Sequence, residues 1–155
     1  MRATFQESRL TPPLLKKALI AQGFEVFRTL KDEIVLAERV RENLILDSGI
    51  RIRPTENDEE FEVRLVLRAE KSDFPSEDDD SLFKRVRTLA VPAVALGYAE
   101  ISAQVTPMKD PSEPDKTLDT FYELFLAKKV TGGLAAVETE VKQAFTLPKT
   151  VAHTH

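Results

Sequence analysis

The sequence predicts an α+β fold: an antiparallel sheet of about five to six strands, with helices at the N-terminus, in the centre and at the C-terminus. First, the stretch from Phe61 to Ala69 alternates apolar with mostly charged side chains, a period typical of a strand with one buried face. Second, strand-like segments joined by short loops precede it, which favours an antiparallel meander. Third, amphipathic helical patterns occur at the start, middle and end of the chain. The expected order is α-β-β-β-(β)-α-β-β-α.

The length and composition are those of one globular domain. A chain of 155 residues can bury its own core, so we expect a single domain over residues 11–147, a flexible lead over 1–10 and a flexible tail over 148–155. The formal net charge of −4 disfavours a nucleic-acid binder. The absence of cysteine excludes disulfides and thiolate chemistry. Without a signal peptide or an apolar run of about 20 residues, the chain is expected to be cytoplasmic and not to insert into a membrane.

The first helix is expected from Pro12 to Gln22. Thr11 can cap its N-terminus, and proline suits the first helical turn because the N–H that it lacks would have no partner there. Apolar residues recur at helical spacing along one face. They are Leu14, Leu15, Ala18 and Leu19. Gly23 stands where a glycine cap would end the helix.

Three strands are expected between this helix and Phe61. Phe24–Arg28 and Glu33–Ala37 have the composition of strands and are separated by a short turn. The next segment, Leu44–Ile52, contains Gly49 and admits two interpretations. It forms one strand with a kink at the glycine, which we prefer, or two short strands around a turn.

The central helix is expected to begin near Ser81, after an acidic connector that runs from Glu70 to Asp80. Acidic residues favour a helix N-terminus because they complement its partial positive charge. Pro92 interrupts the helical pattern, since proline removes one hydrogen bond and crowds the preceding turn. Either the helix kinks at Pro92 or a second short helix begins there.

Two strands and a helix are expected in the last third of the chain. Ile101–Val105 alternates apolar and polar residues, whereas Pro107–Lys116 contains three prolines and is expected to be an irregular loop. Thr117–Val130 carries apolar residues at both parities, so both of its faces are expected to be covered, by helices or by a second subunit. The final amphipathic helix is expected from Leu134 to Phe145.

Few residues are candidates for catalysis. The two histidines, His153 and His155, lie at the chain end, where a base is poorly oriented, so neither a triad nor a metal site is expected. Gly132 and Gly133 lack the Lys-Ser/Thr of a phosphate loop, so a turn is preferred. Two carboxylate clusters indicate solvated loop charge and helix-start charge. They are Glu56, Asp58, Glu59 and Glu60, and Glu77 to Asp80. We therefore expect no catalytic residue, no cofactor and no metal.

Four arginines share the charged parity of neighbouring strands, and two phenylalanines lie on the long strand. The arginines are Arg51, Arg53, Arg64 and Arg68, and the phenylalanines are Phe121 and Phe125. The arginines pair with acidic side chains on a solvated face, which we prefer, or they form a docking surface for an acidic partner. The phenylalanines add apolar area that indicates, with equal weight, oligomerisation or an intramolecular core. Together these residues are the candidate protein-interaction surface.

The order of elements resembles the fold of bacterial type III secretion chaperones and of YbjN-like sensory regulator domains. The resemblance rests on the opening Leu10–Leu15 segment followed by Gly23–Val26, on the central helix from Ser81, and on the last strand, which runs through Thr131–Leu134 into its helix. It covers about residues 10–147. The resemblance implies a small, acidic, non-enzymatic protein, often a homodimer, that binds protein segments on its sheet and flanking helices.

We therefore expect a non-enzymatic protein-binding adaptor or chaperone-like module of a bacterial cell that acts as a homodimer. One alternative is a small-ligand sensor or an enzyme, in which Arg51, Arg64 or Arg68 holds an anion in a pocket between sheet and helices. Another alternative is a structural subunit of a larger assembly, which differs chiefly in the permanence of its contacts.

Overall fold

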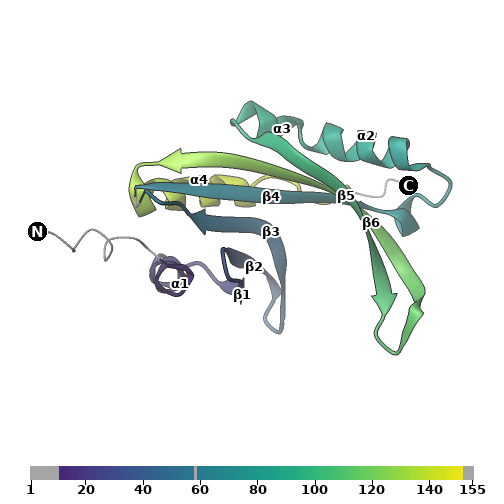
Figure 1. The fold of residues 1–155 in the computed structure, drawn as a ribbon, viewed down its shortest axis with the longest axis horizontal. Helices are drawn as coiled ribbons and strands as arrows, with labels where there is room; N and C mark the ends of the chain where they lie inside the picture. Colours follow the sequence, from purple (N-terminus) through teal and green to yellow (C-terminus); the bar gives the residue numbers. More distant parts are fainter. Residues whose placement is uncertain (1–10, 58, 152–155) are drawn as a thin grey trace, which may run out of the picture. The chain divides into compact units, whose positions relative to one another are not determined.

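The computed structural model describes residues 11–57 and 59–151, whose elements are drawn in Figure 1. In chain order they are α1 (Pro12–Ala21), β1 (Val26–Thr29), β2 (Ile34–Arg41), β3 (Leu44–Pro54), β4 (Glu60–Glu70), α2 (Asp79–Leu89), α3 (Val91–Ala95), β5 (Ala99–Asp110), β6 (Glu113–Thr131) and α4 (Gly133–Phe145). A 3-10 turn, Lys71–Asp73, follows β4. The predicted α+β class, with helices at both ends and in the centre, is confirmed.

In the described part of the chain, six strands form one antiparallel sheet in the order β1-β2-β3-β4-β6-β5. The predicted meander is confirmed, because each strand from β1 to β4 pairs with the next. The preferred interpretation of Leu44–Ile52 is also confirmed, since β3 is one strand that runs through Gly49. Gly49 has a φ of +80°, a conformation that glycine adopts without the steric cost of a Cβ.

The chain divides into two compact units. Unit 1 contains the described residues up to Leu65 together with residues 127–146, and unit 2 contains residues 66–126 and 147–151. Two of the three boundaries fall inside β4 and β6, so each of these strands contributes residues to both units, and the third boundary follows α4. No proline-rich or glycine-rich linker marks these positions, which is why the sequence alone predicts a single domain over residues 11–147.

In unit 1, α1 packs against β1, β2 and β3, and α4 packs against β3. The residues that the two helices bury completely are Leu15, Leu19, Val137 and Val141. The side-chain amide of Gln22 donates a hydrogen bond to the carbonyl of Leu134 at 3.1 Å. The rings of Phe24 and Phe145 stack with centroids 6.4 Å apart. These contacts join the first and last helices around one apolar core.

In unit 2, α2 is fixed at its N-terminus by acidic side chains and packs on β6. The carboxylate of Asp78 caps the helix by accepting a hydrogen bond from the N–H of Ser81 at 2.9 Å. The Tyr122 hydroxyl donates to Asp79 at 2.6 Å, and Phe83 packs edge-on against the Tyr122 ring at 5.4 Å. The buried residues of α2 and α3 are Leu82, Val86 and Ala93, and Ala90 between the two helices is also buried. The acidic connector therefore works as a helix start, as predicted.

Pro92 begins a second helix. α2 ends at Leu89, and α3 has Pro92 in its first turn, where the missing N–H leaves no intrahelical bond unmade. Of the two predicted alternatives, the second short helix is confirmed and the kinked single helix is wrong.

The prediction of an irregular loop over Pro107–Lys116 is wrong. β5 continues to Asp110 and β6 begins at Glu113, so only Pro111 and Ser112 form the turn between them. β5 is the last strand in the sheet order, and an edge strand tolerates proline because an N–H on its outer side has no ladder partner to lose.

β6 has one buried face and one half-buried face. Tyr122, Leu124 and Leu126 are buried, whereas Phe121 and Phe125 at the other parity are half-buried. The prediction that both faces of this strand are covered therefore holds fully for one face and partly for the other.

Candidate functional site

The arginines of β3 meet carboxylates in unit 1. Arg53 Nε donates to Glu33 Oε1 at 2.9 Å, and Arg51 Nε lies 3.2 Å from Glu33 Oε2. Arg51 Nη2 also donates to Asp47 Oδ2 at 3.0 Å. The side chain of Glu33 is 10% exposed, so water screens these ion pairs less than it screens pairs on an open surface.

Arg64 stands directly opposite Arg51 in the β3–β4 ladder, where two like charges would destabilise the sheet. Arg64 Nε donates to the carboxylate of Glu62, which compensates this repulsion. We call the whole group the ionic cluster; it comprises Arg51, Arg53, Arg64, Glu33, Asp47 and Glu62. Its formal charges cancel. The arrangement supports the preferred interpretation of these arginines as ion-paired, and it lacks the excess positive charge that would hold an anion.

The other predicted site residues lie in unit 2. The guanidinium of Arg68 lies 4.6 Å from the ring centroid of Phe121, a cation–π contact between β4 and β6. Phe125 has the same parity as Phe121 on β6 and is also half-buried. Arg68 and Phe121 therefore meet in one unit, whereas the other three predicted arginines belong to unit 1.

The edge strand β5 is a feature that the sequence alone did not single out as a site. Every residue from Ala99 to Val105 is exposed, and the apolar side chains of Ile101 and Val105 are 48% and 44% exposed. The alternation of apolar and polar residues is visible in the sequence. The position of the strand at the sheet edge is not, because it depends on the order of the strands.

The middle of β5 lacks the features by which edge strands avoid pairing with other chains. Such strands usually carry charges, prolines or bulges, or are very short. The opposite edge strand, β1, has only four residues. Residues 101–106 of β5 contain no charge, no proline and no glycine, and Pro107 and Lys109 protect only the end of the strand. This stretch is therefore open to pairing with another strand.

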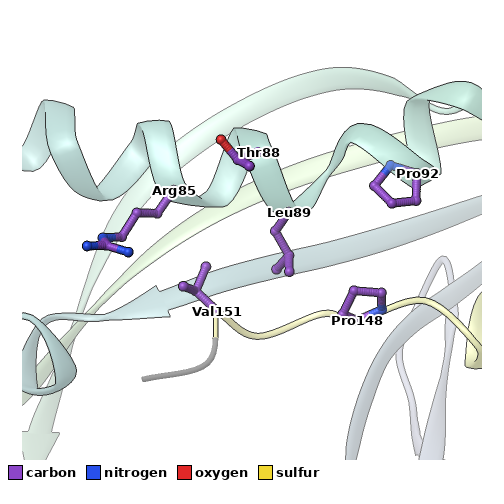
Figure 2. A pocket seen from close by; sticks show the side chains of 6 residues that line it. All are labelled: Arg85, Thr88, Leu89, Pro92, Pro148 and Val151. Atoms are coloured by element: carbon purple, nitrogen blue, oxygen red, sulfur yellow. The ribbon is translucent and has the colours of Figure 1, made fainter. Parts of the chain in front are cut away.

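A groove of about 450 Å³ lies in unit 2 between the α2–α3 helices and residues 147–151, which we call the strap. The groove is lined by Arg85, Thr88, Leu89, Pro92, Pro148 and Val151. Figure 2 shows the side chain of Leu89 on α2 directed toward the strap, from which Pro148 and Val151 form the opposite wall. Most of the lining is apolar, which is typical of a site that takes up an apolar group.

The strap is bonded to β4 at Arg68. The N–H of Arg68 donates to the carbonyl of Lys149 at 2.9 Å, and the N–H of Val151 donates to the carbonyl of Arg68 at 2.9 Å. These bonds make a parallel bridge between Arg68 and Thr150. The backbone of one predicted site residue, Arg68, therefore anchors the strap, while its side chain covers Phe121.

Residues 148–151 of the strap belong to the predicted flexible tail over residues 148–155. Residues 149–151 have a defined position on β4. The pairing of β3 with β4 ends at Leu65, so the backbone of Arg68 is left to bond the strap. Residues 152–155, like the predicted lead over residues 1–10, lie outside the described residues.

Several titratable groups in unit 2 have shifted pKa values, among them Glu70, Tyr122 and Arg85. Burial, together with the nearby charge of Asp73, raises the pKa of Glu70 above its usual range. The hydrogen bond to Asp79, together with burial, raises the pKa of Tyr122 to about 12. Glu70 and Tyr122 do not line the groove, whereas Arg85 does, and its hydrogen bond to Glu77 raises its pKa.

Some of the other sequence candidates have structural partners. The N–H groups of Gly132 and Gly133 both donate to the carbonyl of Glu59 at 3.0 Å, which supports the turn and engages the amides that a phosphate would need. Glu77 accepts two hydrogen bonds from the guanidinium of Arg85, at 2.7 and 2.6 Å. The candidates that lie outside the described residues are Asp58, His153 and His155.

Within residues 11–57 and 59–151, no group of three or more metal-ligating side chains could hold an ion, and no helix is long and apolar enough to cross a membrane.

No protein-family model, curated protein or solved structure matches the chain. The resemblance to secretion chaperones and YbjN-like domains therefore stays a prediction from the order of elements.

Proposed function

We propose that the chain is a non-enzymatic protein-binding module that acts as a homodimer, in which β5 of one copy pairs antiparallel with β5 of the second. The observation that carries the proposal is the uncharged stretch of residues 101–106 at the edge of the sheet, of which residues 101–105 are exposed. A strand at a sheet edge presents backbone donors and acceptors that a further strand can bond.

The sequence of β5 is compatible with pairing to itself. A two-fold axis at Ala103 places Ile101 opposite Val105 on the same face, and such apolar cross-strand pairs contribute about 0.2–1 kcal/mol each. In this register Glu100 falls opposite Thr106, so no two like charges oppose each other along this stretch. The symmetry is that of the commonest oligomers, in which one surface patch binds its own copy.

The predicted residues of unit 2 support the binding of a further polypeptide. Arginine and aromatic side chains are enriched at protein interfaces, and Arg68, Phe121 and Phe125 combine these chemistries on β4 and β6. If the polypeptide bound at these residues later dissociates, the role is that of an adaptor or chaperone-like module. Co-purification from the native cell distinguishes that role from the structural-subunit alternative, in which the partner stays bound throughout purification.

Light scattering during size-exclusion chromatography tests the dimer. The native chain should elute with twice the mass of one chain. The double variant Ile101→Lys with Val105→Lys places lysines opposite each other across the two-fold axis, so it should elute as a monomer. Leu118→Lys is the matched control, because Leu118 is as exposed as Ile101 (48%) but lies on β6 and not on the edge strand; it should remain dimeric.

Two results would contradict the proposal. One is a native chain that stays monomeric at the highest concentration at which it dissolves. The other is a dimer whose mass changes equally, or not at all, in the β5 variant and in the Leu118 control.

A further inference from the structure

We propose that the groove in unit 2 binds an extended peptide of a partner protein beside β4, and that the strap is an internal occupant which this peptide displaces. The inference rests on the proposed protein-binding function and names its binding site and the class of its ligand. It does not depend on the β5 dimer, because the groove is built from other elements, namely α2, α3 and the strap over β4.

The strap shows how a polypeptide is held at this position. It is extended and parallel to β4, and the N–H and the carbonyl of Arg68 both bond it. Main-chain bonding to a strand does not depend on the sequence of the added segment, so another extended segment can make the same two bonds. Both of these bonds centre on one residue of β4.

The side chains of the strap leave the groove incompletely filled. Pro148 and Val151 face α2 and α3, yet about 450 Å³ remains between the two walls. Pockets of about 300–1,000 Å³ commonly accept a ligand. A peptide with larger apolar side chains at the positions of Pro148 and Val151 would fill this space better than the strap does.

The charges around the groove favour an uncharged apolar segment over an anion. Arg85 is the charged residue in the lining, and both oxygens of Glu77 accept hydrogen bonds from it, at 2.7 and 2.6 Å. Its guanidinium also lies 4.2 Å from the ring centroid of Phe74. This pairing neutralises Arg85 and fixes its position, so it works as one wall of the groove and offers little attraction to a carboxylate or a phosphate.

Because the strap belongs to the same chain, it competes with any free peptide. A short tether gives an attached segment an effective concentration in the millimolar range. Loss of one of its two hydrogen bonds should therefore raise the apparent affinity of the groove for a peptide in solution. The proposal thus predicts a binding site that the strap partly masks.

Fluorescence anisotropy with labelled peptides tests this prediction on the full chain. The probes are the strap sequence Leu-Pro-Lys-Thr-Val and the same peptide with leucine in place of valine. Val151→Pro removes the N–H that donates to Arg68, so the variant should bind both probes at least tenfold more tightly than the native chain, and the leucine probe more tightly than the valine probe.

Two variants serve as controls. Thr150→Pro introduces proline one residue earlier, leaves both bonds to Arg68 possible, and should bind the probes as the native chain does. Adding Leu89→Lys to Val151→Pro places a charge in the groove and should abolish binding, while circular dichroism confirms that the fold is retained.

Three results would overturn the inference. The first is equal affinity of the native chain and Val151→Pro, or no saturable binding by either. The second is binding that Leu89→Lys does not weaken. The third is a native dimer that Val151→Pro, and not the β5 variant, converts to a monomer, because the strap of a second copy would then fill the groove. If the chain binds neither peptide but still forms the β5 dimer, this inference is wrong and the proposed homodimer is unaffected.

Discussion

Glu33 is the residue on which the ionic cluster of unit 1 depends. Its carboxylate contacts both Arg51 and Arg53, and its side chain is 10% exposed. Glu33→Gln keeps the shape but removes the charge, so both guanidiniums lose a charged partner in a site partly removed from water. We expect the free energy of unfolding to fall by about 2 kcal/mol, measured by urea denaturation.

The matched control for this prediction is Glu38→Gln. Glu38 is exposed on β2, and replacement of such a surface carboxylate should change the free energy of unfolding by no more than about 0.5 kcal/mol. If the two variants lose equal stability, the ion pairs around Glu33 contribute no more than an exposed charge does.

Tyr122 makes stability depend on alkaline pH. Its pKa is raised to about 12 because its hydroxyl donates to Asp79 and because burial disfavours the phenolate. In the unfolded chain a tyrosine hydroxyl has a pKa of about 10. The contribution of the Tyr122 proton to the free energy of unfolding is fully present below that pH and is lost as the pH rises toward 12. We expect the free energy of unfolding to fall over this range in the native chain.

Tyr122→Phe removes the group that titrates and leaves Tyr98 in place. Urea denaturation of both chains over the same alkaline range should therefore show a shallower fall for the variant. A fall of equal steepness would mean that the proton on Tyr122 does not stabilise the fold.

At the scale of single elements, α2 depends on its cap. The carboxylate of Asp78 accepts a hydrogen bond from the N–H of Ser81, one of the groups that the helix itself leaves unpaired. Asp78→Ala should lower the free energy of unfolding by about 1 kcal/mol. Asp78→Ser should lower it by much less, because serine also caps a helix N-terminus. Asp80→Ala is the comparison, because Asp80 also lies in the first turn but is not the capping residue. Equal losses at both positions would assign the effect to charge near the helix terminus instead of to the cap.

Elements with local signals are the ones that the sequence predicts well. The first helix is expected from Pro12 to Gln22 and forms from Pro12 to Ala21, since its initial prolines and the glycine that follows act within one turn. Thr11 occupies the cap position as expected, although its side chain makes no capping hydrogen bond. Alternation likewise identifies the Phe61 strand, because burial of one face imposes a period of two.

Elements that depend on distant partners are predicted poorly. Pro107 ends a strand in the sequence-based interpretation, but it lies inside β5, because β5 is at the sheet edge and proline is tolerated there. Glu33 pairs with Arg53, twenty residues away, only through the register of β2 and β3. The strap has no periodicity of its own, and its position follows from hydrogen bonds to Arg68. No local pattern carries this information.

At the scale of the whole molecule, the two proposed contacts use separate elements of unit 2. The edge of β5 is assigned to a second copy, and the groove between the α2–α3 helices and the strap is assigned to a partner peptide. The variants that test one contact therefore leave the residues of the other unchanged. A protein that dimerises through one surface and takes up a peptide at another has the properties expected of an adaptor.

The absence of cysteine allows a direct measurement of the β5 pairing. In the proposed dimer Ala103 of one copy lies opposite Ala103 of the other, with a Cβ separation of about 4.5–5.5 Å that is close to the range a disulfide spans. Ala103→Cys should therefore form a covalent dimer under mild oxidation in dilute solution, as resolved on a non-reducing gel. Leu118→Cys, exposed on β6 of the same hairpin, should cross-link only at the rate of random collision. Cross-linking of Ala103→Cys that is no faster than that of Leu118→Cys would contradict the dimer and the function proposed from it.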